Sequence, residues 1–135
     1  MYYGIKIKRT IIGSDGNDKV VAEDYLTDVE LFCEAENNGY QEFNGECDVV
    51  AIKRLPTLRE FVNEPTEDTS EYIYMATLID TFVNEDGSEV ETKYNVAVYA
   101  ENIDSATKKL NEYMRQGLDD LTLVSIKRTK IVSVL

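Results

Sequence analysis

The sequence predicts an α+β fold built from two tandem β-β-α-β units, with antiparallel sheet packed on two helices. A hairpin, a helix and a further strand follow one another twice along the 135 residues, and short sequence segments recur at matching places. We therefore expect an internal duplication. Residues 1–57 form the first unit, residues 58–71 an acidic linker that begins with a short helical or irregular piece, and residues 72–135 the second unit. Together they are expected to make one compact domain.

Alternation of apolar and polar side chains predicts the strands of the first unit. Tyr2–Ile12 has the period of two that is typical of a half-buried strand. A turn rich in Gly, Asp and Asn follows at residues 13–18, and Lys19–Leu26 returns as the second strand of a hairpin. Asp48–Leu55 is the third strand, which Pro56 should end.

A helix is expected between the second and third strands. Thr27 and Glu30 have the spacing of a capping box, in which each side chain satisfies the other's backbone N–H. Cys33 falls on the apolar face of this helix, and Gly39 should end or weaken it. Cys33 and Cys47 are expected to be reduced, buried thiols, although a disulfide is possible if the segment after the helix folds back.

The second unit repeats the same order. Tyr72–Val83 and Val90–Ala100 are strands joined by a turn containing Asp86 and Gly87, a hairpin signal. Asn102 is expected to cap the following helix, and Leu121–Val134 to form one long final strand. The correspondences that indicate duplication are Tyr25 with Tyr99 at a strand end, Asp28 with Asp104 at a helix start, and Val50–Arg54 with Val124–Arg128 in the third strand. Coincidence between two ordinary hairpin units is the alternative.

Charge and composition restrict the classes of partner. The net charge is -12, from 26 acidic and 14 basic residues, which disfavours non-specific attachment to nucleic acid or anionic membranes. An acidic surface suits a basic protein partner or plain solubility. Neither a signal peptide nor a stretch long enough to span a membrane is recognised, so we expect a cytoplasmic protein, in the host cell if it is phage-encoded.

The usual equipment of an enzyme is missing from the sequence. It contains no histidine, and no nucleophile-elbow, phosphate-loop or zinc-binding pattern. We therefore expect no catalytic residues, no cofactor and no metal. Asp15, Asn17 and Asp18 could in principle bind calcium, but they lack the spacing of a calcium loop and more often serve the turn's own backbone.

A tripeptide, Ile-Lys-Arg, occurs three times, each time in an expected strand. If these strands are neighbours, an acidic protein would carry a local basic stripe, with tyrosines nearby as stacking faces for single-stranded nucleic acid. The alternative is solvent-facing residues that pair with glutamates across strands. The candidate binding residues are Lys8, Arg9, Lys53, Arg54, Lys127 and Arg128.

Two segments carry a resemblance to a known family. The first is Val21–Asp28 with Phe32, Glu34, Ala35 and Glu36; the second is Asn95–Ala100 with Asp104, Ala106, Lys109, Leu110 and Met114, then Val124–Ile126 and Thr129–Ile131. These segments resemble an uncharacterised domain family of Bacteroidales genomes and their phages, including crAss-like phages. The resemblance implies a small cytoplasmic protein of a phage or mobile element without a cofactor. It supplies no catalytic or binding residue, and the Ile-Lys-Arg strands depart from it.

These observations favour a non-enzymatic protein that acts by binding another protein. One form would be inhibition of a host system such as a nucleic-acid-guided nuclease, with carboxylates imitating phosphates. The alternative is a replication or recombination accessory that contacts single-stranded DNA through the basic strands. A carboxylate-based metalloenzyme is a third hypothesis. The sequence leaves monomer and homodimer open.

Overall fold

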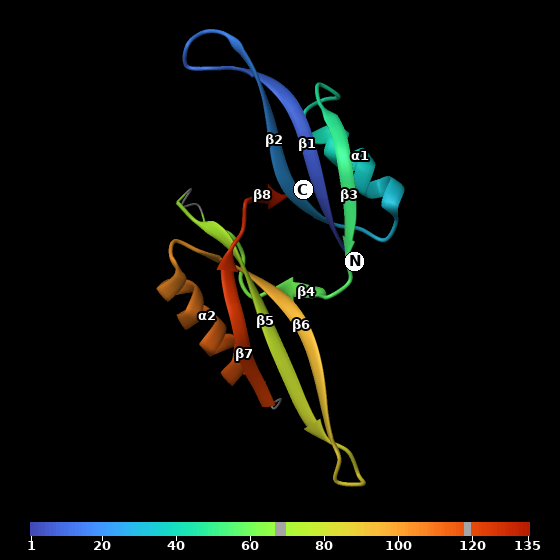
Figure 1. Ribbon diagram of the computed structural model, residues 1–135, viewed down its shortest axis with the longest axis vertical. Coiled ribbons are helices and arrows are strands. Elements are labelled where there is room, and N and C mark those ends of the chain that lie inside the picture. Colours follow the sequence, from blue (N-terminus) through green and yellow to red (C-terminus); the bar gives the residue numbers. More distant parts are fainter. Residues whose placement is uncertain (67–69, 118–119) are drawn as a thin grey trace. The chain divides into compact units, whose positions relative to one another are not determined.

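The chain folds into two compact units, each with its own sheet and helix (Figure 1). The computed structural model describes residues 1–66, 70–117 and 120–135, which form eight strands and two helices. The first unit is Met1–Pro56 together with Lys130–Leu135, and the second is Thr57–Thr129. The predicted α+β class is confirmed. The expected linker, 58–71, and the expected second unit, 72–135, do not coincide with these boundaries, because both repeats contribute residues to each unit.

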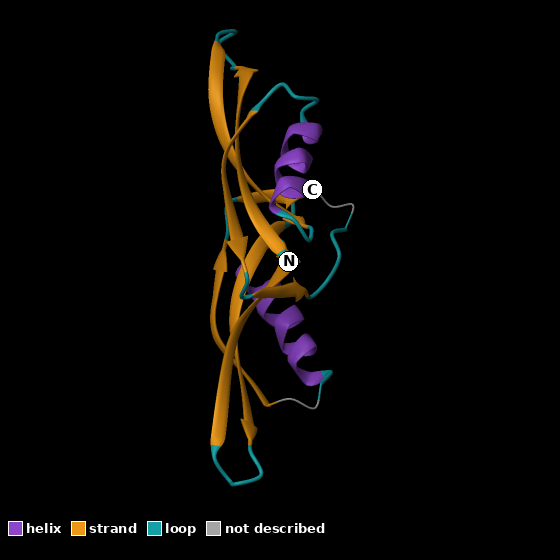
Figure 2. Ribbon diagram, turned by 90° about the vertical axis from the view of Figure 1, so that its right-hand side faces the viewer, coloured by secondary structure: helices purple, strands orange, loops and turns teal. Residues whose placement is uncertain are grey.

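The first unit contains a four-stranded sheet with the strand order β3-β1-β2-β8. Its strands are β1 (Tyr2–Ile12), β2 (Asp18–Asp28), β3 (Asp48–Leu55) and β8 (Ile131–Val134), and its helix is α1 (Phe32–Glu42). β1 pairs antiparallel with β2 and with β3, whereas β8 runs parallel to β2. α1 lies against one face of this sheet (Figure 2).

The second unit repeats this arrangement with the strand order β4-β6-β5-β7. Its strands are β4 (Leu58–Phe61), β5 (Tyr72–Val83), β6 (Glu89–Ala100) and β7 (Asp120–Arg128), and its helix is α2 (Ile103–Arg115). β5 pairs antiparallel with β6 and β7, and β4 runs parallel to β6. The two sheets therefore have the same topology, as a duplication predicts.

The short fourth strand of each sheet comes from the other repeat. β4 follows β3 in the chain but pairs with β6, and β8 follows β7 but pairs with β2 (Figure 1). The registers correspond: the N–H of Leu135 donates to the carbonyl of Leu26 at 2.7 Å, and that of Val62 to the carbonyl of Ala97 at 2.8 Å.

This exchange corrects two expectations from the sequence. Leu58–Phe61, expected to be helical or irregular, is a strand, and residues 67–69 of the expected linker lie outside the described residues. Leu121–Val134, expected to be one strand, is divided at Thr129 and Lys130 into β7 and β8. Alternation has the same period on both sides of such a break, so it cannot report a change of sheet.

The residue ladders identify which positions of the two repeats correspond. β1 and β3 lose register between Lys6 and Ile7, and β5 and β7 lose it between Thr77 and Leu78. In both sheets the extra, bulged residue is a valine of the edge strand, Val50 in β3 or Val124 in β7. Both valines lie within the matching sequence segments, Val50–Arg54 and Val124–Arg128. That part of the expected correspondence is confirmed.

The other two expected correspondences are wrong. Tyr25 pairs with Ile5 and Val96 pairs with Ala76, so the ladders match Tyr25 with Val96 rather than with Tyr99. Asp28 is the last residue of β2, whereas Asp104 lies in the first turn of α2. The identical residues of these two pairs therefore occupy positions that are not structurally equivalent.

The first helix also begins later than its capping signal suggested. Thr27 is a fully buried residue of β2: its Oγ1 accepts from Asn38 Nδ2 at 2.9 Å and donates to the carbonyl of Leu135 at 3.3 Å. α1 follows Leu31, which supplies no side-chain cap. By contrast, Asn102 caps α2 as expected, because its Oδ1 accepts from the Ser105 N–H at 2.8 Å.

Gly39 sets how closely α1 approaches its sheet. A Cβ placed there would lie 2.8 Å from Cγ2 of Val49 and 3.4 Å from Cγ2 of Ile5. The helix continues through this residue to Glu42, so Gly39 does not end it. Ala35 and Gly39 are the buried residues of α1, and Ala106 and Leu110 hold the same spacing in α2. Glycine is therefore needed here for close packing rather than for termination.

Neither cysteine is fully buried, in contrast to the expectation from the sequence. Cys33 is exposed, and Cys47 is half-buried with its Sγ 3.7 Å from the carbonyl of Gly39. Both are free. Burial, followed by the charge of Asp48, raises the pKa of the Cys47 thiol, which disfavours its thiolate.

A polar clasp fastens the chain between β4 and β5 to the second unit. Glu71, whose side chain is 7% exposed, accepts from the N–H and Oγ1 of Thr66 at 2.9 and 2.6 Å, and lies 3.4 Å from Lys109 Nζ. Lys109 also donates to the carbonyl of Tyr99 at 2.8 Å. Asn63 binds both backbone groups of Tyr99. The hydrogen bonds from Thr66, and then Lys109, lower the pKa of Glu71.

Replacement of Gly39 by Leu, the residue at the matching place in α2, should destabilise the protein. Steric conflict with Val49 and Ile5 should lower the free energy of unfolding by about 1–3 kcal/mol, despite a gain of about 1 kcal/mol in helix propensity. Urea unfolding measures this. Asn37→Leu, at an exposed position of the same helix, should change stability by less than about 0.5 kcal/mol. Equal or higher stability of Gly39→Leu would contradict the packing described.

Glu71→Gln should weaken the dependence of stability on pH below neutrality. Because folding lowers the pKa of Glu71, its ionised form stabilises the folded state above the unfolded pKa. That contribution is lost as pH falls through the folded value. The free energy of unfolding, measured from pH 7 to about pH 3, should therefore change less with pH for Glu71→Gln than for wild type. Thr66→Val should show part of this effect. Superimposable pH profiles for wild type and Glu71→Gln would refute this assignment.

Candidate functional site

The sheet alternation separates the lysines of the Ile-Lys-Arg segments from the arginines. Lys8 and Lys53 project from the face of the first sheet that is opposite α1, which we call the helix-free face. Lys127 lies on the corresponding face of the second sheet, where it pairs with Met75. Arg54 and Arg128 fall on the helix side, across from Tyr3 and Tyr74. The six predicted residues therefore do not share one sheet or one face.

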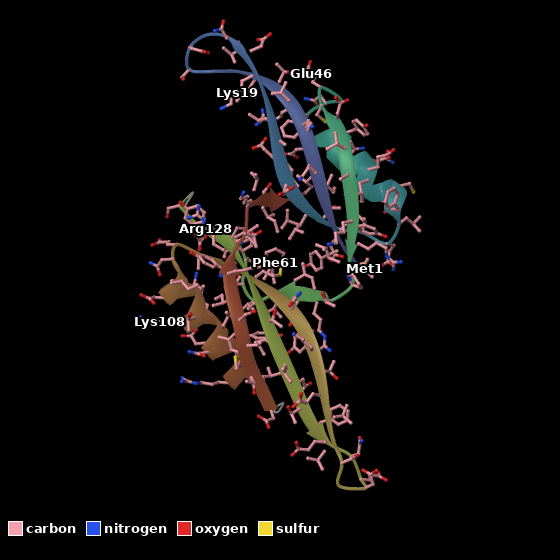
Figure 3. The ribbon with its side chains drawn as sticks, in the orientation of Figure 1. Met1, Lys19, Glu46, Phe61, Lys108 and Arg128 are labelled. Carbon is pink, nitrogen blue, oxygen red and sulfur yellow. The ribbon has the colours of Figure 1, made fainter. Side chains whose placement is uncertain are left out.

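Two of the predicted arginines, Arg9 and Arg128, make specific contacts on the helix side of their sheets. Arg9 Nε lies 2.8 Å from a Glu23 carboxylate oxygen, and its guanidinium is 4.7 Å from the ring centre of Phe43. The hydrogen bond to Glu23 raises the pKa of Arg9. Arg128 lies at the end of β7 (Figure 3). Its guanidinium carbon is 4.0 Å from the ring centre of Tyr72. Arginines in ion pairs and over aromatic rings are explained by structure alone.

An apolar hollow of about 320 Å³ lies on the helix-free face of the first sheet. Gly4 and Ala51 form low points on neighbouring strands, and Leu26, Leu55 and Ile131 supply apolar walls. A Cβ on Gly4 would meet nothing nearer than Leu55 Cδ1 at 3.7 Å. The backbone therefore leaves room at Gly4 that a side chain would fill. This volume is at the lower end of the range of small-molecule sites.

The charges at the rim of the hollow are unevenly distributed. Lys53 on β3 and Lys6 on β1 are exposed and lie on the same side. Asp24 on β2 is half-buried and lies opposite Lys6 in the ladder, whereas Lys53 lies opposite Gly4. Within the described part of the chain neither lysine forms an ion pair within 4.0 Å. A ligand would therefore meet positive charge over β3 and β1 and a carboxylate over β2.

The second repeat has different side chains at the same ladder positions. Met75 stands where the first repeat has Gly4, and Thr77 and Asn95 stand where it has Lys6 and Asp24. Thr77 Oγ1 lies 2.9 Å from Asn95 Oδ1, a neutral cross-strand contact. Lys127 keeps the place of Lys53, but the second sheet combines a long side chain with an uncharged pair, so the glycine floor and the second lysine, Lys6, belong to the first repeat.

Sequence reasoning identified Lys53 but missed the hollow. The signal was Gly4, a glycine inside an otherwise regular strand, which often marks a close approach or an open space. Its partners Ala51, Leu55 and Ile131 come from two other strands. Ile131 in particular reaches the site through the exchange of β8, which alternation does not reveal.

Other candidate chemistry is explained locally. Asp15 accepts from the N–H of Asn17 at 3.0 Å, so this turn serves its own backbone as expected, and the bonds from Asn17 lower the pKa of Asp15. Across the residues that the structure describes, no group of three or more Cys, Asp or Glu residues is arranged to hold a metal ion. Neither described helix is long and apolar enough to cross a membrane.

Comparison with known families places the chain in one of them. A family model described as a domain of unknown function, DUF4494, matches residues 1–135. The chain therefore belongs to this family, which confirms the expectation of an uncharacterised domain family. Comparisons with curated proteins and with solved structures found no match.

Proposed function

We propose that this chain is a non-enzymatic binding protein that receives a segment of a partner protein in the hollow of its first sheet. The segment would carry an apolar side chain next to a carboxylate. The observation that carries the proposal is the combination of open apolar space at Gly4 with Lys53 and Lys6 on one side. In a chain of net charge -12, a local pair of cations is the feature that would select an acidic segment.

The arrangement of the rim suggests how such a segment would lie. Its carboxylate would approach Lys53, which has no acidic residue opposite it in the ladder. Its apolar side chain would rest over Gly4, against the half-buried Leu55 and Ile131, where burial of apolar surface contributes affinity. A backbone or side-chain N–H could donate to Asp24. A peptide suits an open sheet face because it offers these groups at fixed spacing.

Single-stranded DNA is the alternative function, and the same face bears on it. Lys6, Lys8 and Lys53 project from one face, but Asp24 and Asp48 lie directly across from Lys6 and Lys8. Alternating charge is poorly suited to following a phosphate backbone. Moreover, three of the nearby tyrosines are poorly placed to stack on bases over this face: Tyr3 and Tyr74 are buried, and Arg128 covers Tyr72.

The biological context follows from the resemblance alone. We propose a phage or mobile-element protein that acts in the host cytoplasm on a host protein, of which a nucleic-acid-guided nuclease is one example. The hollow favours recognition of an acidic segment on that partner over imitation of phosphates by this chain's own carboxylates.

Selection of random peptides displayed on yeast, with the purified chain as bait, tests this proposal. Enriched peptides should combine Asp or Glu with a neighbouring aliphatic or aromatic residue. For a purified enriched peptide, Lys6→Gln with Lys53→Gln should weaken binding about tenfold, since each exposed charge pair contributes up to about 1 kcal/mol. Gly4→Met, which introduces the second repeat's residue, should weaken binding at least as much by filling the hollow.

Matched controls separate this site from general charge. Lys19→Gln with Lys93→Gln removes the same charge from exposed lysines elsewhere and should leave peptide binding unchanged. Circular dichroism should show that Gly4→Met remains folded. Absence of peptide enrichment, or equal binding by Gly4→Met, would overturn the proposal. Lysine-dependent, salt-sensitive binding of a fluorescent oligothymidine instead would establish the alternative.

A further inference from the structure

The chain consists of two halves, each of which completes the other's sheet. The first half, residues 1–61, contains β1–β3 and carries β4; the second half, residues 72–135, contains β5–β7 and carries β8. β4 pairs with β6, and β8 pairs with β2. Val62 and Asn63 continue β4 along β6, and residues 64–71 complete the covalent connection between the halves, so the strand pairing itself does not require that both halves belong to one molecule.

We propose that two copies of this chain pair by exchanging halves, the first half of one with the second half of the other. In such a dimer every described strand would keep its present neighbour and register. Exchange of identical elements creates few new contacts, so its equilibrium depends mainly on the connection and on protein concentration. The partner is therefore a second copy of this chain, and the surfaces used are the edges of β2 and β6.

Interactions in both sheets give the exchanged strands their place. At the edge of β2, the carbonyl of Leu26 accepts from Leu135 at 2.7 Å, and Thr27 holds the carbonyl of Leu135 at 3.3 Å. At the edge of β6, Val62 bonds to Ala97 at 2.8 Å and Asn63 binds the backbone of Tyr99 twice. These bonds are specific for the incoming strands and would form equally well with strands of another copy.

The clasp around Glu71 favours the closed monomer. To reach a second molecule, the connection from Asn63 to Tyr72 must open, and it can span at most roughly 30 Å, at about 3.4 Å per residue. Extension separates Thr66 from Glu71, which now accepts two hydrogen bonds from it at 2.6 and 2.9 Å. Charge-assisted hydrogen bonds of this kind are stronger than neutral ones, so their loss opposes exchange. Removal of the Glu71 carboxylate should therefore shift the balance towards the dimer.

Refolding from guanidinium chloride of chains carrying two different affinity tags tests exchange. A flexible connection gives an effective concentration on the order of 1 mM. Mixed dimers should therefore be scarce at about 10 µM and rise roughly in proportion to concentration. Tandem affinity purification followed by light scattering measures them. Glu71→Ala should raise the dimer fraction several-fold, whereas native chains mixed without unfolding should yield little mixed dimer.

A complementation pair separates exchange from ordinary surface association. Ile7→Asp damages the core of the first half and Leu78→Asp that of the second, since both side chains are fully buried. Each unit has its own core, so either variant refolded alone should keep only its undamaged unit, whereas the two refolded together should give a mixed dimer, recovered through both tags, in which one pair of halves is intact. Failure to recover this mixed dimer, or dimers that form equally well from mixed native chains, would overturn the proposal, as would a monomer at every concentration for both wild type and Glu71→Ala.

Discussion

The parallel pairing of two short edge strands, β8 with β2 and β4 with β6, is the interaction on which the rest of the structure depends. Each supplies the fourth strand of a sheet whose other three strands come from the other repeat. Without β8, the backbone groups of β2 around Leu26 would be an open edge, and Thr27 would lose its bond to Leu135. The same strand brings Ile131 to the hollow, so the candidate site and the fold depend on one pairing.

Most of the local structure was predictable because local signals determine it. β1, β3 and β5 have the predicted bounds, and Asn102 caps α2, since alternation, Pro56 and a capping side chain act over a few residues. The exchanged strands were not predictable, because pairing partners are chosen by contacts far apart in the chain. The capping box at Thr27 failed for the same reason: burial against Asn38 and Leu135 outweighs a local preference for a helix start.

The candidate site could be predicted only in part. A period of two places every second residue on one face, so it shows that adjacent Lys and Arg of one tripeptide must point in opposite directions. Applied to Lys53 and Arg54, it would have removed the arginines from a common basic stripe. It gives no information on Asp24 and Asp48, which stand across from Lys6 and Lys8 and reduce the stripe's positive potential. Those neighbours depend on register, which the turns and the bulge at Val50 set.

Comparison of the repeats gives the strongest physical reason to regard the hollow as a site. Glycine inside a strand costs about 0.5–1 kcal/mol relative to alanine. The backbone of Gly4 does not require it, because its φ is not in the left-handed region and a Cβ would have ordinary contacts. Gly39, by contrast, is explained by its 2.8 Å approach to Val49. At Gly4 the stability cost yields only open space beside Lys6 and Lys53, and Met75 shows that the same topology accepts a long side chain there. Open space beside two lysines is the observation on which the proposed binding function rests.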